Sequence, residues 1–278
     1  MFAFSQCKNL TSVTLPSSVT TIGRGAFGSC ESLTAVQLPD SIESIERNAF
    51  ESCSSLTSVM LPNSLTTIEQ NTFIHCHSLA SVTIPESVTT IETFAFSSCY
   101  SLTSITIPSQ VNSIAKNAFG GCYKLVEVYN KSSLYIEAGS SYEGGVALNA
   151  KAVYTQPYTS KLSIDSNGYV LYTDGNEISL IDYRGTEKNL VLPNGITDIN
   201  QYAFYTQNDL TSVVIPASVK TIGKGAFYDC TSLTSVTFEN MEGWTANTTS
   251  ISSADLANRE TAIAYLTDTY GFSVWQRN

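Results

Sequence analysis

Two histidines and the cysteine between them are the residues of this chain best suited to metal chemistry. His75 and His77 flank Cys76, and imidazole nitrogens and thiolates are preferred zinc ligands. The sequence holds no second ligand pair at metal-binding spacing. Because Cys76 belongs to a regularly spaced column of cysteines, we expect it to point inward and the histidines to point away from it. The sequence therefore predicts no metal site and no cofactor.

A column of carboxylates is the second candidate for chemistry. Glu46, Glu69 and Glu92 recur every 23 residues and would align on the outside of a repeating structure. Carboxylate oxygens are calcium ligands, but stacked like charges on a solvated face are the simpler interpretation. The motifs of serine hydrolases, P-loop proteins and zinc proteases are absent from the sequence. We therefore expect no catalytic residues and no enzymatic activity.

The interval of 23 residues runs through most of the chain and dictates the elements that position any site. A fixed period in the twenties indicates a solenoid, in which each coil buries its apolar side by stacking on its neighbours. The period returns in a second block after residue 186. The columns of the first block are Leu10, Leu33, Leu56, Leu79, Leu102 and Leu125; Pro16, Pro39, Pro62, Pro85 and Pro108; Phe4, Phe27, Phe50, Phe73, Phe96 and Phe119; and Cys7, Cys30, Cys53, Cys76, Cys99 and Cys122.

A single coil, residues 10–32, is predicted to contain two short strands. Val13 and Leu15 alternate with polar neighbours, which is typical of a strand with one face inward. Pro16 ends this strand because it has no N–H to continue a ladder. The β-branched segment that ends at Ile22 predicts a second strand on the opposite side of the coil. A tight turn then brings Phe27 between the two sides.

The cysteine column predicts buried free thiols. Cysteine is among the most buried residue types and packs as a small hydrophobe, and the even spacing differs from the pattern of small disulfide-rich secreted domains. Disulfides are the alternative, because coils stacked about 5 Å apart bring neighbouring cysteines within bridging distance. Cys230 continues the column in the second block.

The full pattern L-x-x-V-x-L-P-x-x-V-x-x-I-x-x-x-A-F-x-x-C-x-x resembles the BspA-like leucine-rich repeats of bacterial and protist surface proteins. Five complete copies span residues 10–124, and a second block spans about 187–238. Thr72 departs from the alanine column and Gln207 from the cysteine column. The resemblance implies a leucine-rich-repeat solenoid, mostly β with short helical turns, built as a curved right-handed array of coils with parallel strands. It also implies a cell-surface or secreted protein engaged in adhesion or host contact, and it brings no catalytic residues.

The period divides the chain into a first repeat block at 1–129, an irregular segment at 130–186, a second repeat block at 187–238 and a C-terminal cap at 239–278. In the irregular segment, Ala147-Leu148 is expected to replace the Ala-Phe pair of an elongated coil with a return strand at 152–154. Strands at 169–173 and 178–183 flank Asp174-Gly175-Asn176, which predicts a hairpin embedded in the array. A helix over 255–267 and a strand at 272–275 are expected to form an α/β cap over the final coil.

Composition limits the partners of the chain. The formal net charge of −10 and the scattered Lys and Arg disfavour nucleic acid, because phosphate binding needs clustered cations. The sequence contains no apolar run of 18 residues, so we expect no membrane insertion, and its first ten residues do not resemble a signal peptide. Because these residues match the second half of a repeat, we expect the natural protein to extend further at this end or Met1 to begin a trimmed product.

Tyrosines are concentrated in the irregular segment. Interfaces favour tyrosine, which indicates a binding edge, whereas packing across the predicted hairpin is the alternative. The tyrosines concerned are Tyr135, Tyr142, Tyr154, Tyr158, Tyr169, Tyr172 and Tyr183.

The exposed strand face is the remaining candidate for a binding site. Most of its positions are Ser or Thr, and a site on a repeat scaffold is expected where residues depart from that consensus on a concave face. Gln37, Met60, Glu127 and Tyr129 are such departures, although drift at positions that bind nothing is the alternative. We predict a non-enzymatic module that binds an extracellular protein or glycan on this face. A structural stalk of a larger surface protein is the main alternative, and a hydrolase is a further one.

Overall fold

The computed structural model describes residues 1–205 and 207–277 and divides the chain into two compact units, Met1–Tyr158 and Thr159–Asn278. The boundary falls inside the segment 130–186, between the elongated coil and the hairpin. Each unit has a hydrophobic core of its own, which runs from Ile22 to Ala147 in the first unit and from Tyr169 to Trp275 in the second. The chain therefore folds as two bodies, each with its own interior.

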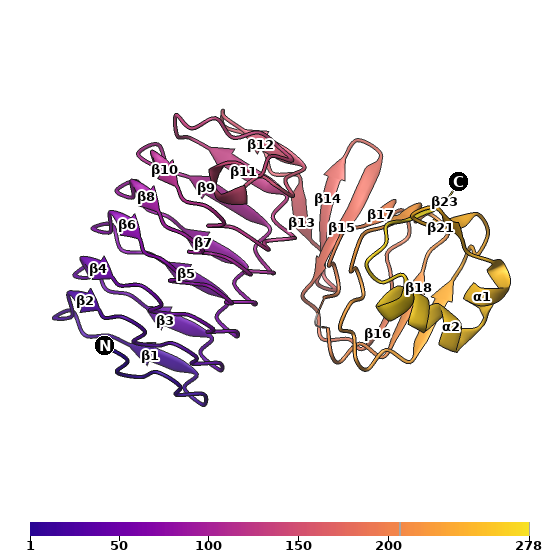
Figure 1. Cartoon of the computed structure of the whole chain (residues 1–278), viewed down its shortest axis with the longest axis horizontal. Coiled ribbons are helices and arrows are strands. Elements are labelled where there is room, and N and C mark those ends of the chain that lie inside the picture. Colours follow the sequence, from indigo (N-terminus) through magenta and orange to yellow (C-terminus); the bar gives the residue numbers. More distant parts are fainter. Residues whose placement is uncertain (206, 278) are drawn as a thin grey trace. The chain divides into compact units, whose positions relative to one another are not determined.

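The first unit is a stack of coils with strands on two opposite sides (Figure 1). We call the side with the longer strands the strand face and the opposite side the return side. All strand pairs here are parallel. Those between repeats are one repeat apart, so that Val13 lies opposite Val36 and Ile22 opposite Ile45, whereas the elongated last coil places Val153 opposite Val128. The strand face consists of β1 (Ser12–Thr14), β3 (Ala35–Gln37), β5 (Ser58–Met60), β7 (Ser81–Thr83), β9 (Ser104–Ile107), β11 (Glu127–Asn130) and β12 (Ala152–Tyr154). The return side consists of β2 (Thr21–Ile22), β4 (Ser44–Ile45), β6 (Thr67–Ile68), β8 (Thr90–Ile91) and β10 (Ser113–Ile114).

The alternating sequence pattern accounts for the strand face. In β5, for example, Ser58 and Met60 are exposed and Val59 is buried between them, as the two-residue period of a strand requires. Hydrogen-bonded pairing joins β1 to β3, β5 to β7, and β9 to β11 and β12. Among the described strands, β3 and β5 are neighbours that share no such ladder, and so are β7 and β9. The sheet of the strand face is therefore divided into three parts.

The turn after each return strand carries a phenylalanine into the middle of the coil. The rings of Phe27, Phe50 and Phe73 stack face to face with centroids 5.3 and 5.4 Å apart, and the column continues to Phe119. The turn contains two left-handed residues, which in one coil are Asn48 (φ 63°) and Ser52 (φ 57°). Short polar residues and glycine tolerate this conformation best and occupy most of these positions, although Phe94 and His75 adopt it as well.

The predicted column of buried free thiols is confirmed for six of the seven cysteines. All seven are free, and only Cys7, in the first coil, is exposed. Each buried thiol donates a hydrogen bond to the carbonyl of the phenylalanine in the preceding coil, as Cys53 Sγ does to Phe27 O at 3.2 Å. Burial raises the pKa of Cys53 and of Cys122 to about 12. These thiols therefore remain protonated donors at neutral pH.

The two departures from the repeat consensus are accommodated by hydrogen bonds. Thr72 is buried in the alanine column, and its hydroxyl donates to the carbonyl of Glu69 at 2.7 Å. Gln207 replaces a cysteine, and its Nε2 donates to the carbonyl of Tyr183 at 3.0 Å. Because each polar group inside the coil has a partner, neither departure costs the full penalty of an unpaired buried group.

The elongated coil at the end of the first unit differs in part from the prediction. Strand β12 forms as expected and pairs with β11. The prediction that Ala147-Leu148 replaces the Ala-Phe pair is wrong, because Ala147 is buried but Leu148 is 45% exposed. The N–H of Phe119 instead donates to the carbonyl of Gly144 at 3.0 Å, a bond that Phe96 makes to an alanine carbonyl. The 3₁₀ turn η1 (Glu143–Gly145) thus takes the place of the Ala-Phe pair.

The second unit contains the predicted hairpin. Strands β14 and β15 pair antiparallel, and Gly175 at the turn has a φ of 61°. Strand β15 then pairs in parallel with the return strand β17, so the hairpin extends the return side of the second block. This confirms the predicted leucine-rich-repeat solenoid with an embedded hairpin. The strands are β13 (Leu162–Ile164), β14 (Tyr169–Asp174), β15 (Glu177–Tyr183), β16 (Asn189–Val191), β17 (Asp198–Ile199), β18 (Ser212–Ile215), β19 (Thr221–Ile222) and β20 (Ser235–Phe238).

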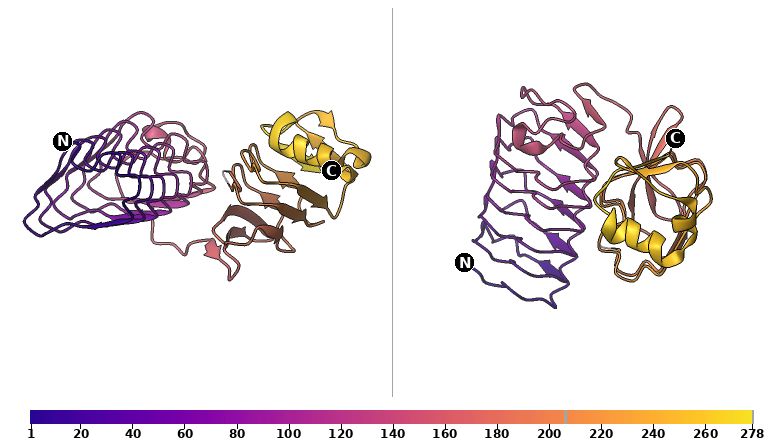
Figure 2. Two further views of the ribbon diagram at one scale, coloured as in Figure 1. Left: turned by 90° about the horizontal axis from the view of Figure 1, so that it is seen from below. Right: turned by 45° about the vertical axis from the view of Figure 1, so that its right-hand side comes forward.

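A small α/β cap covers the C-terminal end of the second unit (Figure 2). The expected helix over 255–267 is split, because Asn258 ends one helix and caps the next by accepting the N–H of Thr261 through its side chain. The expected last strand lies slightly later and pairs antiparallel with β19. The elements are β21 (Trp244–Ala246), β22 (Thr249–Ser250), α1 (Ser253–Ala257), α2 (Arg259–Ala264), the π-helical turn η2 (Tyr265–Thr269) and β23 (Trp275–Arg277).

Both tryptophans belong to the core of this cap. The rings of Trp244 and Trp275 contact Phe238 of the last repeat strand, with centroids 5.6 and 6.3 Å away. All three rings are buried. The cap therefore covers the aromatic end of the final coil, as the sequence predicted.

Candidate functional site

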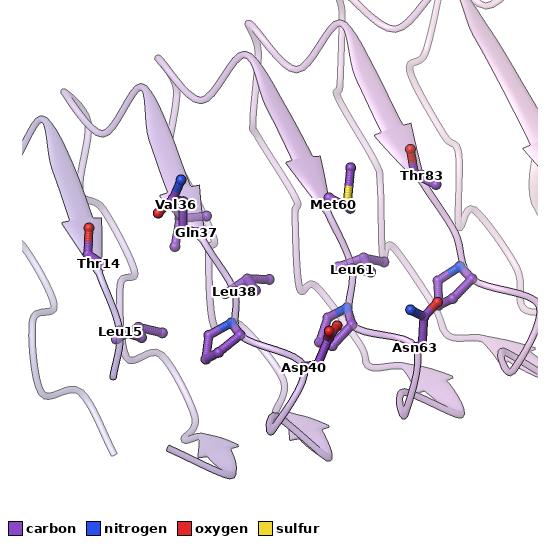
Figure 3. A pocket seen from close by; sticks show the side chains of 13 residues that line it. Thr14, Leu15, Val36, Gln37, Leu38, Asp40, Met60, Leu61, Asn63 and Thr83 are labelled. Carbon is purple, nitrogen blue, oxygen red and sulfur yellow. The ribbon is translucent and has the colours of Figure 1, made fainter. Parts of the chain in front are cut away.

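A groove crosses the strand face of the first unit at the C-terminal ends of β1, β3, β5 and β7 (Figure 3). Its volume is about 570 Å³. In each coil, the last strand residue is followed by Leu or Ile, then by Pro, then by a polar turn residue, and these positions in successive coils supply the lining. Two of the four predicted site residues, Gln37 and Met60, lie on this groove.

The groove has an apolar floor between two exposed rims. Leu61 on the floor is 3% exposed, and the proline that follows it is buried. Gln37 and Met60 form the strand rim, and Asp40 and Asn63 form the turn rim; all four are exposed. This arrangement follows from the strand period, because the last strand residue points outward and the next one points inward before proline turns the chain.

Met60 is the departure from consensus with the clearest physical consequence. It lies opposite Thr83 in the strand register and is 73% exposed. Thr14 and Thr83 occupy the same position in other coils that line the groove. Methionine is apolar and flexible, and it packs adaptably against partners. It lies beside the apolar floor of the groove.

The charge of the groove is negative. Asp40 is the only ionisable residue that lines it, and among the described residues its carboxylate has no hydrogen-bond or ion-pair partner. The carboxylate of Glu86, in the same turn position two coils later, is engaged by the Ser109 N–H at 3.0 Å and the Lys131 ammonium at 3.1 Å. These two contacts, together with one from the Ser109 hydroxyl, lower the pKa of Glu86.

The other two predicted site residues lie at the far end of the strand face and do not line the groove. Glu127 is fully buried, against the expectation of an exposed position, because strand β12 and an aromatic cluster cover this end of the face. Tyr129 is half-buried, and its ring meets Tyr158 edge to face at 5.4 Å. Tyr158 also stacks on Tyr154 at 3.7 Å. Burial raises the pKa of Tyr158, and the nearby charge of Glu127 adds to this.

The tyrosines that suggested a binding edge fall into different environments. Tyr169, Tyr172 and Tyr183 are each 4% exposed within the hairpin, so packing accounts for them. Tyr135 and Tyr142, in the elongated coil, are 80% and 82% exposed. The sequence pattern had grouped these residues, but only the three in the hairpin strands β14 and β15 are buried, whereas Tyr135 and Tyr142 lie outside the strands.

The His-Cys-His triplet follows the repeat register. Cys76 is buried, whereas His75 is exposed and His77 stacks on Tyr100 with ring centroids 4.7 Å apart. Burial, with a smaller contribution from His75, lowers the pKa of His77. Across residues 1–205 and 207–277, no three His, Cys, Asp or Glu side chains are grouped to hold a metal ion.

The acidic column forms on the outside of the coils, as predicted, and it lies directly after the return strands. Glu46, Glu69 and Glu92 share one depression with Arg24 and Arg47, so opposite charges lie beside the carboxylates.

In the part of the chain that the structure describes, no helix has the length and apolar character needed to cross a membrane.

The turn rim of the groove was not among the predicted site residues. Asp40 and Asn63 follow the prolines, and the pattern had assigned those positions only to the end of a strand. A usable signal exists, because the position after each proline is a polar column: Ser17, Asp40, Asn63, Glu86 and Ser109. The proximity of this column to the strand rim depends on how sharply the chain turns at proline.

Several solved structures are similar to this chain. A leucine rich cell surface protein from Faecalibacterium prausnitzii A2-165 is 32% identical over 85% of this chain and 56% of its own, with a TM-score of 0.45. A leucine-rich repeat protein from Bacteroides ovatus ATCC 8483 is 23% identical over 84% of this chain and 64% of its own, with a TM-score of 0.44. The T. pallidum leucine rich repeat protein is 41% identical over 48% of this chain and 62% of its own, with a TM-score of 0.46. The chain thus spans less than two thirds of each of these chains.

The repeats themselves establish the family. No curated protein matches this chain. The sequence model of the BspA type leucine rich repeat region matches in six copies, over residues 1–126 and 183–265, which together make up more than half of the chain. Both regions contain the leucine and phenylalanine columns whose side chains form the two cores. The chain therefore belongs to the BspA type leucine-rich repeat family.

Proposed function

We propose that the first unit binds an extracellular protein or glycan on its strand face and that the groove beside Gln37 and Met60 is the contact site. The module is non-enzymatic and adhesin-like. One observation carries this proposal. A single groove of about 570 Å³ combines an apolar floor, in which Leu61 is 3% exposed, with Met60, which is 73% exposed at the rim. Apolar concavities with a few polar groups at their edge are the usual form of a binding site.

Membership of the BspA type family supports the same function and a location on the cell surface or outside the cell. A repeat scaffold presents its variable side chains on an extended face, where they can contact a large ligand. In this proposal, Tyr129 provides a second contact at the far end of the face. Glu127 takes no part, because it is buried.

A structural stalk is the second candidate function. The observation that favours it is the regular column of stacked phenylalanines, which continues from Phe4 to Phe119. Such a column stiffens a solenoid whether or not its surface binds anything.

The proposal is tested with the purified chain on an array of extracellular-matrix proteins and glycans. We expect at least one ligand to bind, and the double variant Gln37→Thr/Met60→Thr, which restores the consensus residue of neighbouring coils, to weaken that binding at least tenfold. Val191→Thr is the matched control, because Val191 is also an exposed apolar residue of a strand, at 68% exposure, but lies in the second unit.

Circular dichroism and thermal melting should be the same for all three proteins, since every changed side chain is exposed. Binding that survives the double variant would move the site elsewhere. The absence of any ligand would favour the stalk.

A further inference from the structure

We propose that the groove takes an extended peptide segment of a protein partner, in which an apolar side chain packs beside Met60 and a nearby lysine or arginine pairs with Asp40. This inference rests on the proposed function and deepens it, because it selects a peptide over a glycan and states the sequence character of the ligand.

The dimensions of the groove suit a short extended segment. Its lining comes from four successive coils, those of β1, β3, β5 and β7. Coils spaced about 4.8 Å apart give a length of roughly 14 Å, and an extended chain advances about 3.3 Å per residue. About four residues therefore fill the groove when the peptide runs across the strands (Figure 3).

The floor provides an apolar contact that is continuous across coils. The floor is lined by Leu38, Leu61 and the prolines after them, and Met60 lies beside them at the strand rim. A leucine- or phenylalanine-sized side chain placed there removes apolar surface of Met60 and of the floor from water. The flexible methionine side chain adjusts to the shape of such an anchor.

The negative charge of the groove favours a peptide that carries a lysine or arginine close to its apolar side chain. Asp40 is exposed at the turn rim, has no partner among the described residues and is the only ionisable lining residue. The chain as a whole carries a formal charge of −10. A lysine or arginine of the partner reaches Asp40 without meeting a competing cation, whereas an acidic residue is repelled.

The lining does not suit a sugar. No aromatic side chain lines the groove, so there is no ring on which the apolar face of a sugar would pack. The side-chain amides are limited to Gln37 and Asn63, which leaves few groups to hydrogen-bond many hydroxyls. The apolar floor and single carboxylate match a peptide with one apolar and one basic side chain.

The test uses a phage-displayed library of random linear heptapeptides selected on the immobilised full chain. We expect the selected peptides to share an apolar residue with a lysine or arginine one or two positions away. One selected peptide is then synthesised, and its affinity is measured by fluorescence anisotropy at low and high NaCl. Met60→Thr should weaken binding about tenfold, and Asp40→Asn about threefold to fivefold.

Two matched controls separate the groove from general surface effects. Glu43→Gln removes a carboxylate that is exposed, belongs to the same coil as Asp40 and does not line the groove. Val191→Thr removes an exposed apolar side chain of the second unit. Neither should change the affinity.

Salt should weaken binding to the wild-type chain and to Glu43→Gln. It should weaken binding to Asp40→Asn much less, because salt screens the ion pair that this variant lacks. Asp40→Lys should invert the preference, so that selection yields acidic peptides.

Failure of this inference is distinguishable from failure of the proposed function. Selected peptides whose binding is unaffected by Met60→Thr and Asp40→Asn, or a selection that yields no peptide, would overturn the peptide inference. If a glycan or folded protein from the array still binds in a manner that depends on Met60, the proposed function stands. If nothing binds in either experiment, both fail.

Discussion

At the scale of single residues, stability comes from columns in which the same side chain meets its copies in the neighbouring coils. The ring of Phe73 is fully buried and stacks on Phe50 and Phe96, at 5.4 Å on each side. Phe4 occupies the same column but is 43% exposed and, among the described residues, stacks on one ring, that of Phe27. The two positions therefore differ in burial and in the number of ring contacts, while residue type and repeat register are the same.

This difference predicts unequal costs of truncation. Phe73→Ala should lower the free energy of unfolding by about 3–5 kcal/mol, the range for removing a fully buried ring. Phe4→Ala, the matched control, should cost less than half as much, because part of its surface already faces water. Urea denaturation of both variants provides the measurement. Equal losses would show that burial in the column does not set the stability.

The thiol column predicts a loss of stability in alkali. Burial raises the pKa of Cys53 and Cys122 from 9.0 to about 12, so the folded state holds these protons more tightly than the unfolded state. The stabilising contribution is complete below pH 9.0 and is lost as the pH rises towards 12, at up to about 1.4 kcal/mol per pH unit for each thiol. Urea denaturation across this pH range measures the slope.

Two cysteine variants test the origin of that slope. Cys53→Ala should flatten it, because one buried thiol no longer titrates. Cys7→Ala should leave it unchanged, because Cys7 is exposed. A slope that is the same in all three proteins would assign the alkaline loss to other groups, such as Tyr169, whose pKa burial also raises to about 12.

At the scale of elements, the hairpin depends on its turn. β14 and β15 are joined by Gly175 and Asn176, since Asp174 pairs with Glu177. Gly175 occupies the first central position with a φ of 61°, a conformation that glycine adopts without a steric penalty. Because β15 continues into the return side of the second unit through β17, the turn also supports the edge of the repeat sheet.

Gly175→Ala should therefore destabilise the second unit by about 1–2 kcal/mol, the cost of a left-handed conformation for an L-residue. No other group lies near the added methyl, so the effect isolates backbone strain. Gly28→Ala is a suitable control, because Gly28 does not adopt a positive φ and its added methyl meets only ordinary contacts. Thermal denaturation compares the two. No change in Gly175→Ala would mean that the turn relaxes without strain.

At the scale of the whole molecule, two separate cores predict two unfolding events. The first core comprises side chains from Ile22 to Ala147 and the second from Tyr169 to Trp275, with no side chain in common. Calorimetry of the full chain should resolve two transitions. Phe73→Ala should lower the first unit's transition only, and Trp275→Ala should lower the other only. A single transition that moves with either variant would show that the two cores unfold together.

The sequence by itself determined the fold class, because a period of 23 residues places every leucine, proline, phenylalanine and cysteine of a coil opposite its counterpart in the next coil. The inward thiols, the phenylalanine column and the hairpin at Gly175 all follow from local pattern and chain stereochemistry. The tyrosines at 169, 172 and 183 could not be separated from those at 135 and 142 by pattern alone, since their burial depends on how the hairpin packs in the folded chain.

The tertiary structure decided the site. Gln37 and Met60 could be singled out because they break a Ser/Thr column, but their groove exists only because proline folds Asp40 and Asn63 to the opposite rim. Glu127 breaks the same Ser/Thr pattern, at the first position of its strand, and is nevertheless buried, because strand β12 pairs beside it and Tyr158 lies close to its carboxylate. Repeat periodicity describes contacts between equivalent positions, so contacts between positions that are not equivalent, such as these, require the folded chain.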